Sequence, residues 1–144
     1  MGHELTMLRG YKRMRKLYKI YAKEARTRAV KSHTDLTAQG GTMGQIEGIC
    51  AILRLRDACS LFCKAVVDGL TVIDNDFRKL LTHAYILRIP ADVLVLRYGI
   101  SRSALYRKLQ QARRQFKRAL INLGFDEDWL ANNYAGYFIA NRNS

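Results

Sequence analysis

Proline, alternating β-branched runs and long apolar runs are all scarce in this sequence. One proline stands among 144 residues, and few stretches alternate β-branched with polar side chains, which predicts an all-α fold. No apolar run is long enough to span a bilayer, and no signal-peptide pattern opens the chain. We therefore expect a cytoplasmic protein that has no membrane partner.

Cysteines and catalytic motifs are also few. The three cysteines, Cys50, Cys59 and Cys63, form no CxxC pair and have no histidine near them in sequence, which predicts three buried, reduced thiols and no metal site. There is no nucleophile elbow and no zinc-protease helix. The glycine-rich stretch QGGTMGQ (39–45) lacks the Gly-Lys-Ser/Thr end of a phosphate loop. These absences predict a protein that is not an enzyme and needs no cofactor.

Acidic residues are also scarce. The sequence contains 12 Asp and Glu but 25 Lys and Arg, which gives a net charge of +13. Residues 1–31 hold ten basic and two acidic residues, and residues 86–123 hold nine and one, whereas residues 45–85 are neutral. Two basic blocks imply a polyanionic partner, with nucleic acid first and a membrane surface second. Charge alone supplies affinity without sequence preference.

The first basic block predicts a long helix over residues 4–31. Apolar residues recur along it at three- and four-residue spacing, and basic residues follow the far side. The apolar seam comprises Met7, Tyr11, Met14, Tyr18, Tyr21 and Ala25. We interpret the seam as core packing. The basic side, with Lys12, Lys16 and Lys19, faces solvent, phosphate groups or an acidic protein.

Ser, Thr, Asp and Gly are concentrated in residues 32–44, which predicts a loop. Thr42 and Gln45 have the spacing of a capping box. They predict the start of a mostly buried helix over 45–70 that ends at Gly69.

The stretch GISRSALYRKL (99–109) has the pattern of a helix-turn-helix. Pro90 suits the first turn of the short helix ADVLVLRY, and Gly99 can take the positive φ that turns the chain. Ser101 can cap a second, basic helix. Its apolar face comprises Leu105, Leu109, Ala112, Phe116 and Leu120. These features predict a helix-turn-helix over 90–122; the alternative is a helical hairpin with a solvated basic face.

A DNA-binding pair of this kind inserts its second helix into the major groove, with the first turns against the bases. The predicted DNA-binding residues are Ser101, Arg102, Ser103, Tyr106, Arg107, Gln110, Arg113 and Arg114. Arg107 is the expected base reader, because an arginine can bond both acceptors of a guanine. Arg113 and Arg114 lie further along and are expected to reach phosphates.

The rest of the chain is predicted to be helical too. A helix over 75–88 is expected to pack over the two helices that follow it, and Gly124 with Phe125 predicts a Schellman-type end of the second basic helix. The predicted domains are a basic N-terminal helix with a glycine-rich loop (1–44), a helical core with the helix-turn-helix (45–124), and a short C-terminal helix (125–144).

The stretch FRKLLTHAYILRIPADVLVLRYGISRSALYRKLQQA resembles the region 4 module of bacterial sigma factors. In such modules a helix that ends near an aromatic residue leads through a short link into the helix-turn-helix. The matching positions are Tyr85, Ile89, Pro90, Leu94, Gly99, Ile100, Ser101 and Tyr106. Val95 departs from the family pattern, which has a small alanine there against the second helix.

A wider stretch, about residues 7–118, resembles the ArpU/RinA-type late transcription regulators of phages that infect Gram-positive bacteria. The similarity includes LRGYKRMRKLYK, the loop TDLTAQGGTMGQIE and the long helix before the sigma-like module. It implies a sequence-specific activator of phage late genes that binds double-stranded DNA at a promoter and engages host RNA polymerase in the host cytoplasm. Lys12, Lys16 and Lys19 then become candidates for a phosphate or a polymerase contact.

Other functions stay open on the sequence alone. Phage Q-type antiterminators are similar in size, carry a sigma-like helix-turn-helix and travel with polymerase. Small terminase subunits are basic, helical and phage-encoded, but they place the helix-turn-helix first. The operator sequence, the polymerase surface and the oligomeric state are not determined, and either the N-terminal seam or the aromatic C-terminal helix could join two copies as a homodimer.

Overall fold

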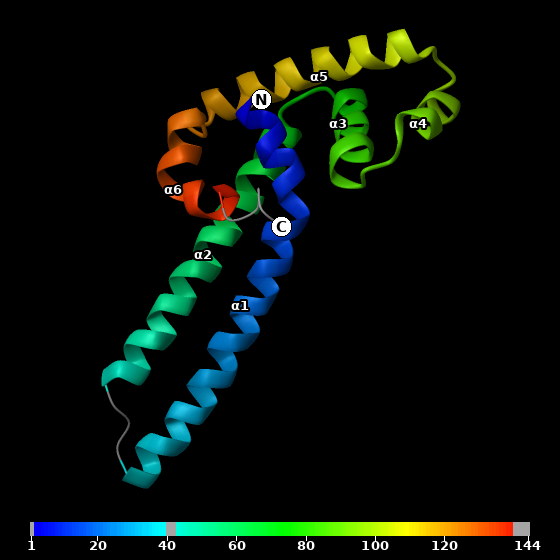
Figure 1. Cartoon of the computed structure of the whole chain (residues 1–144). Coiled ribbons are helices and arrows are strands. Elements are labelled where there is room, and N and C mark those ends of the chain that lie inside the picture. The colour runs from blue at the N-terminus through cyan, green and yellow to red at the C-terminus, as the bar shows by residue number, and fades with distance from the viewer. Residues whose placement is uncertain (1, 40–42, 140–144) are drawn as a thin grey trace. The chain divides into compact units, whose positions relative to one another are not determined.

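The computed structural model describes the backbone of residues 2–39 and 43–139, and the side chains of residues 2–31 and 43–136. Within these residues every regular element is a helix, so the expected all-α fold is confirmed. The elements drawn in Figure 1 are α1 (His3–Gln39), α2 (Met43–Thr71), α3 (Asn75–Leu81), the π-helix η1 (Thr82–Ile86), α4 (Ala91–Tyr98), α5 (Arg102–Asn122) and α6 (Glu127–Ile139).

The helices form two compact units. One consists of Met1–Tyr11 with Lys64–Ser144, and the other of Lys12–Cys63. Both divisions fall inside a helix, because α1 and α2 each contribute residues to both units. The boundaries expected from charge and composition, at 44/45 and 124/125, lie elsewhere and stay a prediction.

The unit Lys12–Cys63 is an antiparallel pair of helices, built from parts of α1 and α2 (Figure 1). The predicted seam of α1 is largely a buried stripe, in which Met14 and Ala25 are buried and Tyr21 is half-buried. Tyr18 differs, since 38% of its surface is exposed. Core packing of the seam is therefore confirmed for most of its length.

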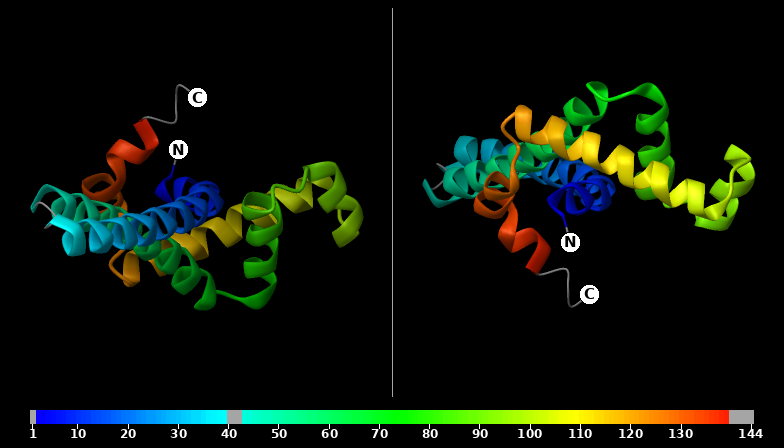
Figure 2. Two further views of the ribbon diagram at one scale, coloured as in Figure 1. Left: turned by 90° about the horizontal axis from the view of Figure 1, so that it is seen from below. Right: turned by 90° about the horizontal axis from the view of Figure 1, so that it is seen from above.

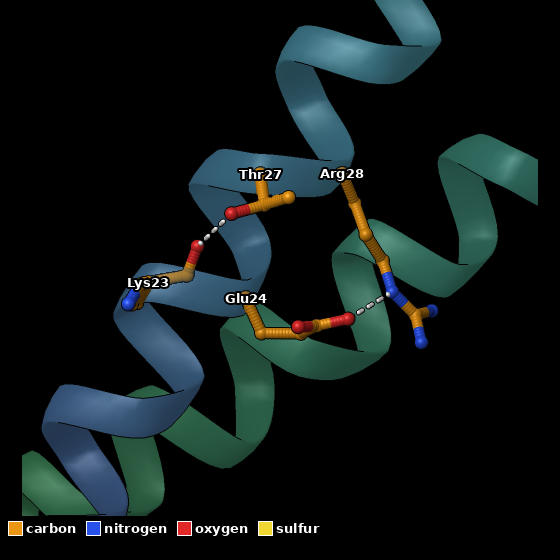
Figure 3. Close-up of polar contacts among 4 residues, drawn as sticks. All are labelled: Lys23, Glu24, Thr27 and Arg28. Atoms are coloured by element: carbon orange, nitrogen blue, oxygen red, sulfur yellow. Dashed lines mark hydrogen bonds and ion pairs between the residues drawn. The ribbon is translucent and has the colours of Figure 1, made fainter.

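The exposed side of α1 in this unit is supported by bonds between residues four apart. Figure 3 shows Thr27 Oγ1 donating to the Lys23 carbonyl at 3.0 Å. In the same view Arg28 Nε donates to Glu24 Oε1 at 2.9 Å. Such pairs stabilise a helix by a few tenths of a kcal/mol each, roughly 0.2–0.5.

The loop expected over residues 32–44 is wrong for most of its length, because α1 continues to Gln39 and α2 begins at Met43. Ser, Thr and Asp each weaken a helix by only about 0.7 kcal/mol or less, so a run of them does not end one. Thr42, the expected cap, lies outside the described residues.

The end of α2 also differs from expectation, because the helix continues to Thr71 and Gly69 lies inside it. A Cβ at Gly69 would lie 2.7 Å from Phe116 Cε1, so glycine permits the close approach of α5. The helix end is covered by Arg78, whose Nε donates to Leu70 O at 2.7 Å and whose Nη2 donates to Thr71 O at 2.9 Å. These are two of the four carbonyls that a helix end leaves unpaired.

The single helix expected over 75–88 is two elements, α3 and the π-helix η1. Apolar spacing does not distinguish an α-turn from one wider turn, so the π-helix was not predictable from it. His83 in η1 bonds to α4, with Nδ1 2.7 Å from Tyr98 Oη. Arg88 has a φ of 55°, and Pro90 precedes α4 in an extended conformation instead of occupying its first turn.

The expected packing of α3, α4 and α5 is confirmed by one apolar cluster. Leu80 of α3, Leu94 of α4 and Leu105 with Leu109 of α5 are buried together. Half-buried residues around them are Ala84, Tyr85, Ile89, Ala91, Val95, Tyr98 and Ile100. Both views of Figure 2 show α3 crossing α5. The cluster fixes α5 against the two shorter helices.

The two ends of α5 have the geometry that their residues predict. Gly99 has a φ of 63°, and Ser101 Oγ accepts a hydrogen bond from the backbone N–H three residues on, at 3.1 Å. At the other end Gly124 has a φ of 91°, and Phe125 N donates to Leu120 O at 2.8 Å, which is the Schellman pattern.

The final helix expected within residues 125–144 is α6, which has acidic residues in its first turn. Asp126 Oδ1 accepts from Trp129 N at 2.8 Å and so caps it. The Trp129 ring lies 4.8 Å from that of Phe125 and 5.2 Å from that of Tyr134. Tyr134 is buried, so this aromatic group contributes to the core of its unit.

Replacing Ser101 by Ala removes the observed cap of α5 and should lower the free energy of unfolding by about 1 kcal/mol, within a range of roughly 0.5–2. Urea denaturation followed by circular dichroism measures the change. Ser103→Ala is the matched control, because Ser103 lies inside the same turn without being the cap. Equal losses in the two variants would contradict the assignment of the cap.

Candidate nucleic-acid interface

The helix α5 has one apolar face and one polar, basic face. The buried face consists of Leu105, Leu109, Ala112, Phe116, Ala119 and Leu120. Six of the predicted DNA-binding residues are exposed, namely Ser101, Arg102, Ser103, Arg107, Gln110 and Arg114. Tyr106 lies beside them with 52% of its surface exposed. The sequence-predicted groove-facing set is therefore accessible in this unit.

The charge of α5 has one sign only. Its sequence, RSALYRKLQQARRQFKRALIN, contains seven Lys and Arg and no acidic residue. Arginine carries five N–H donors in a planar fork, which matches phosphate oxygens and the acceptors on a guanine edge. Exposed glutamine can in turn bond an adenine edge at two atoms. The face thus carries groups suited to both the backbone and the bases of a duplex.

The first turn of α5 contains an ion pair that charge counting did not reveal. Arg102 Nη2 contacts Asp92 Oδ1 of α4, across the three-residue connection between the helices. Both side chains are on the surface, with 57% of Arg102 and 79% of Asp92 exposed. The pair leaves most of the arginine's donors open to a further partner.

Arg113, which was expected to reach a phosphate, has a partner inside its own unit. Its Nη2 donates to Glu4 Oε1 at 3.1 Å. The Glu4 side chain is only 6% exposed and that of Arg113 32% exposed. A buried carboxylate needs such a partner, because desolvation of an unpaired charge costs several kcal/mol, on the order of 3–5. A phosphate contact would compete with this internal role.

The three lysines proposed from the N-terminal block, Lys12, Lys16 and Lys19, are all exposed on α1. They belong to the unit Lys12–Cys63, whereas α5 belongs to the other unit. Their exposure leaves solvent, phosphate and protein contacts all available to them.

The prediction of three buried cysteines is wrong for Cys50, which is exposed, and right for Cys59. Cys63 is half-buried. Burial is the main cause that raises the pKa of the Cys63 thiol to about 11, and the nearby Cys59 raises it further. Arg15 acts in the opposite direction. At neutral pH this thiol therefore stays protonated and is a poor nucleophile.

The bonds of Arg78 and the ion pair of Asp92 are among the contacts of the unit with α5 that were not predicted from the sequence. The Arg78 bonds to α2 have no signature in composition or spacing. The pairing of Asp92 does have a signal in the sequence, since it is the single acidic residue within 86–123.

Comparison with protein-family models, with curated proteins and with solved structures returns no match. In the part of the chain that the structure describes, no helix combines the length and the apolar character needed to cross a membrane.

Proposed function

We propose that this protein is a sequence-specific, DNA-binding transcription activator of phage late genes, which acts at a promoter together with host RNA polymerase in the host cytoplasm. In this proposal α4 and α5 form the helix-turn-helix, and α5 lies in the major groove. The late-gene assignment comes from the resemblance of the sequence to ArpU/RinA-type regulators.

The observation that carries the proposal is the exposed, basic face of α5 behind a well-capped first turn. Arg107 and Gln110 are exposed there, and the opposite face is buried against α3 and α4. A helix that is rigidly held on one side can present its other side to a groove without rearrangement. Side chains suited to bonding bases and side chains suited to bonding phosphates occur together on this face.

An ordinary helical hairpin with a solvated basic face accounts less well for the same features. A solvated face needs no particular side chains, whereas this helix pair combines a three-residue connection, a cap at Ser101 and seven basic residues without an acid on α5. Local geometry and charge thus agree with groove binding.

Transcription in vitro tests the proposal. The template carries a late promoter from the phage genome that encodes the chain and a downstream terminator. Host polymerase is added with and without the protein. We expect more initiation and an unchanged fraction of read-through at the terminator. Increased read-through at constant initiation would instead identify a Q-type antiterminator, and no change in either would contradict both functions.

The basic side of α1 supplies a second test. Replacing Lys12, Lys16 and Lys19 together by Ala should weaken binding to operator and random DNA equally, if these side chains contact phosphates. The slope of log K against log salt should then fall by up to about 0.9 for each lost contact. Binding measured between low and moderate salt checks this. Unchanged affinity with lost activation would assign the three lysines to polymerase, and no effect at all would contradict both roles.

A further inference from the structure

The pair of Asp92 and Arg102 stands out within the proposed interface. Asp92 is the one acid among the 38 residues 86–123, which also hold nine basic residues. It lies in the first turn of α4, and its carboxylate contacts Arg102, the first residue of α5. Arg102 is the basic residue at the N-terminal end of α5, which is the end that contacts base edges when such a helix lies in a groove.

The stability that this ion pair adds does not account for the pairing of Asp92 with Arg102. Both side chains are more than half exposed, and exposed ion pairs contribute little to folding. An exposed carboxylate near a duplex also repels the phosphates and so lowers affinity for any DNA. The α4 dipole favours an acid in the first turn of the helix, as it does in any helix. That interaction needs no arginine, so it does not explain the contact with Arg102.

Orientation of the arginine does account for it. A free arginine loses much rotamer freedom when it binds, whereas one that is already held by a carboxylate loses less. The contact recorded here uses one Nη atom of Arg102, and a guanidinium has five N–H donors. The remaining donors can bond two acceptors on the edge of one guanine.

We propose that Asp92 is a positioning residue that holds Arg102 for reading a guanine in the major groove. This inference rests on the proposed function and extends it. Arg102 then reads one base pair and Arg107 another. Asp92 lowers the affinity for DNA of any sequence and raises the discrimination at the base pair that Arg102 reads.

Selection of binding sites from a random duplex pool tests the inference with the full chain. Arg102→Ala should remove the preference for guanine at one position of the selected sequence, by roughly 5- to 150-fold. Asp92→Ala should weaken the preference at that same position by about 2- to 12-fold, since only orientation is lost. Its affinity for scrambled DNA should rise, because a repulsive charge is gone.

Two further variants make the result specific. The double variant Asp92→Ala/Arg102→Ala should discriminate no worse at that position than Arg102→Ala alone, because the aspartate acts through the arginine. Asp76→Ala is the matched control, since Asp76 occupies the first turn of α3 as Asp92 occupies that of α4. It should leave every position of the selected sequence unchanged. Asp92→Glu should restore part of the preference, and thermal melting checks that each variant folds.

The outcomes separate this inference from the proposed function. If the wild-type chain selects no common sequence, the proposed function fails. If it selects one but Arg102→Ala and Asp92→Ala change different positions, or Asp92→Ala changes none, the positioning role is wrong while the proposed function stands. Asp92→Asn, which keeps the size of the side chain and removes its charge, gives the same decision should Asp92→Ala not fold.

Discussion

Replacing Arg107 by Ala is expected, under the proposed function, to lower the affinity for the operator by roughly 5- to 150-fold and to leave binding to scrambled DNA nearly unchanged. The reason is that one bidentate contact to a guanine is worth about 1–3 kcal/mol of discrimination. Arg107 is exposed in the second turn of α5, opposite the buried Leu105 and Leu109. This placement directs it away from the core and, under the proposed function, toward the bases.

Competition binding on operator and scrambled duplexes at fixed salt measures the effect. Arg114→Ala is the matched control, because Arg114 is exposed on the same helix two turns further along. This variant is expected to lower the affinity for both duplexes by the same factor, as loss of a phosphate contact does. If Arg107→Ala also lowers the affinity for both duplexes equally, Arg107 contacts a phosphate and the assignment of the base-reading face is wrong.

Replacing Leu105 by Ala should lower the free energy of unfolding by about 2–5 kcal/mol. Leu105 has 0% of its surface exposed and lies in the cluster that joins α3, α4 and α5. The loss has two parts, the apolar surface no longer buried and the cavity that remains in a close-packed layer. Since domains are stable by only about 5–15 kcal/mol, this is a large fraction of the total.

Urea denaturation followed by circular dichroism measures that change. The neighbouring helix offers a matched control in Leu96, which is 83% exposed on α4, so Leu96→Ala should change stability by no more than about 0.5 kcal/mol. Binding to operator and to scrambled DNA should fall together in Leu105→Ala as the variant unfolds. A loss no larger than that of Leu96→Ala would show that the cluster does not hold α5 in place.

Local signals explain why α5 was predictable. Gly99, Ser101 and Gly124 each act through their own backbone or side chain, and the structure shows the φ values and the cap that they imply. The apolar face followed from spacing alone, because a helix brings residues three and four apart onto one side. These features need no knowledge of distant residues.

Features that depend on distant residues differ from the sequence prediction. Gly69 is predicted as a helix end, but it lies inside α2 and its role depends on Phe116, which is far away in sequence. Likewise the ion pair of Glu4 with Arg113 joins the start of α1 to the middle of α5, and neither residue reveals its partner in the sequence. The predicted loop is wrong for a different reason, because Ser, Thr and Asp in residues 32–39 have only weak preferences against a helix.

Footprinting of the purified chain tests sequence-specific binding most directly, on DNA taken, as the proposed function directs, from upstream of the late genes of a phage genome that encodes the chain. We expect one short protected segment that persists in an excess of scrambled DNA and disappears with Arg107→Ala. Protection spread evenly along the fragment, or protection that scrambled DNA removes completely, would contradict sequence-specific binding by α5.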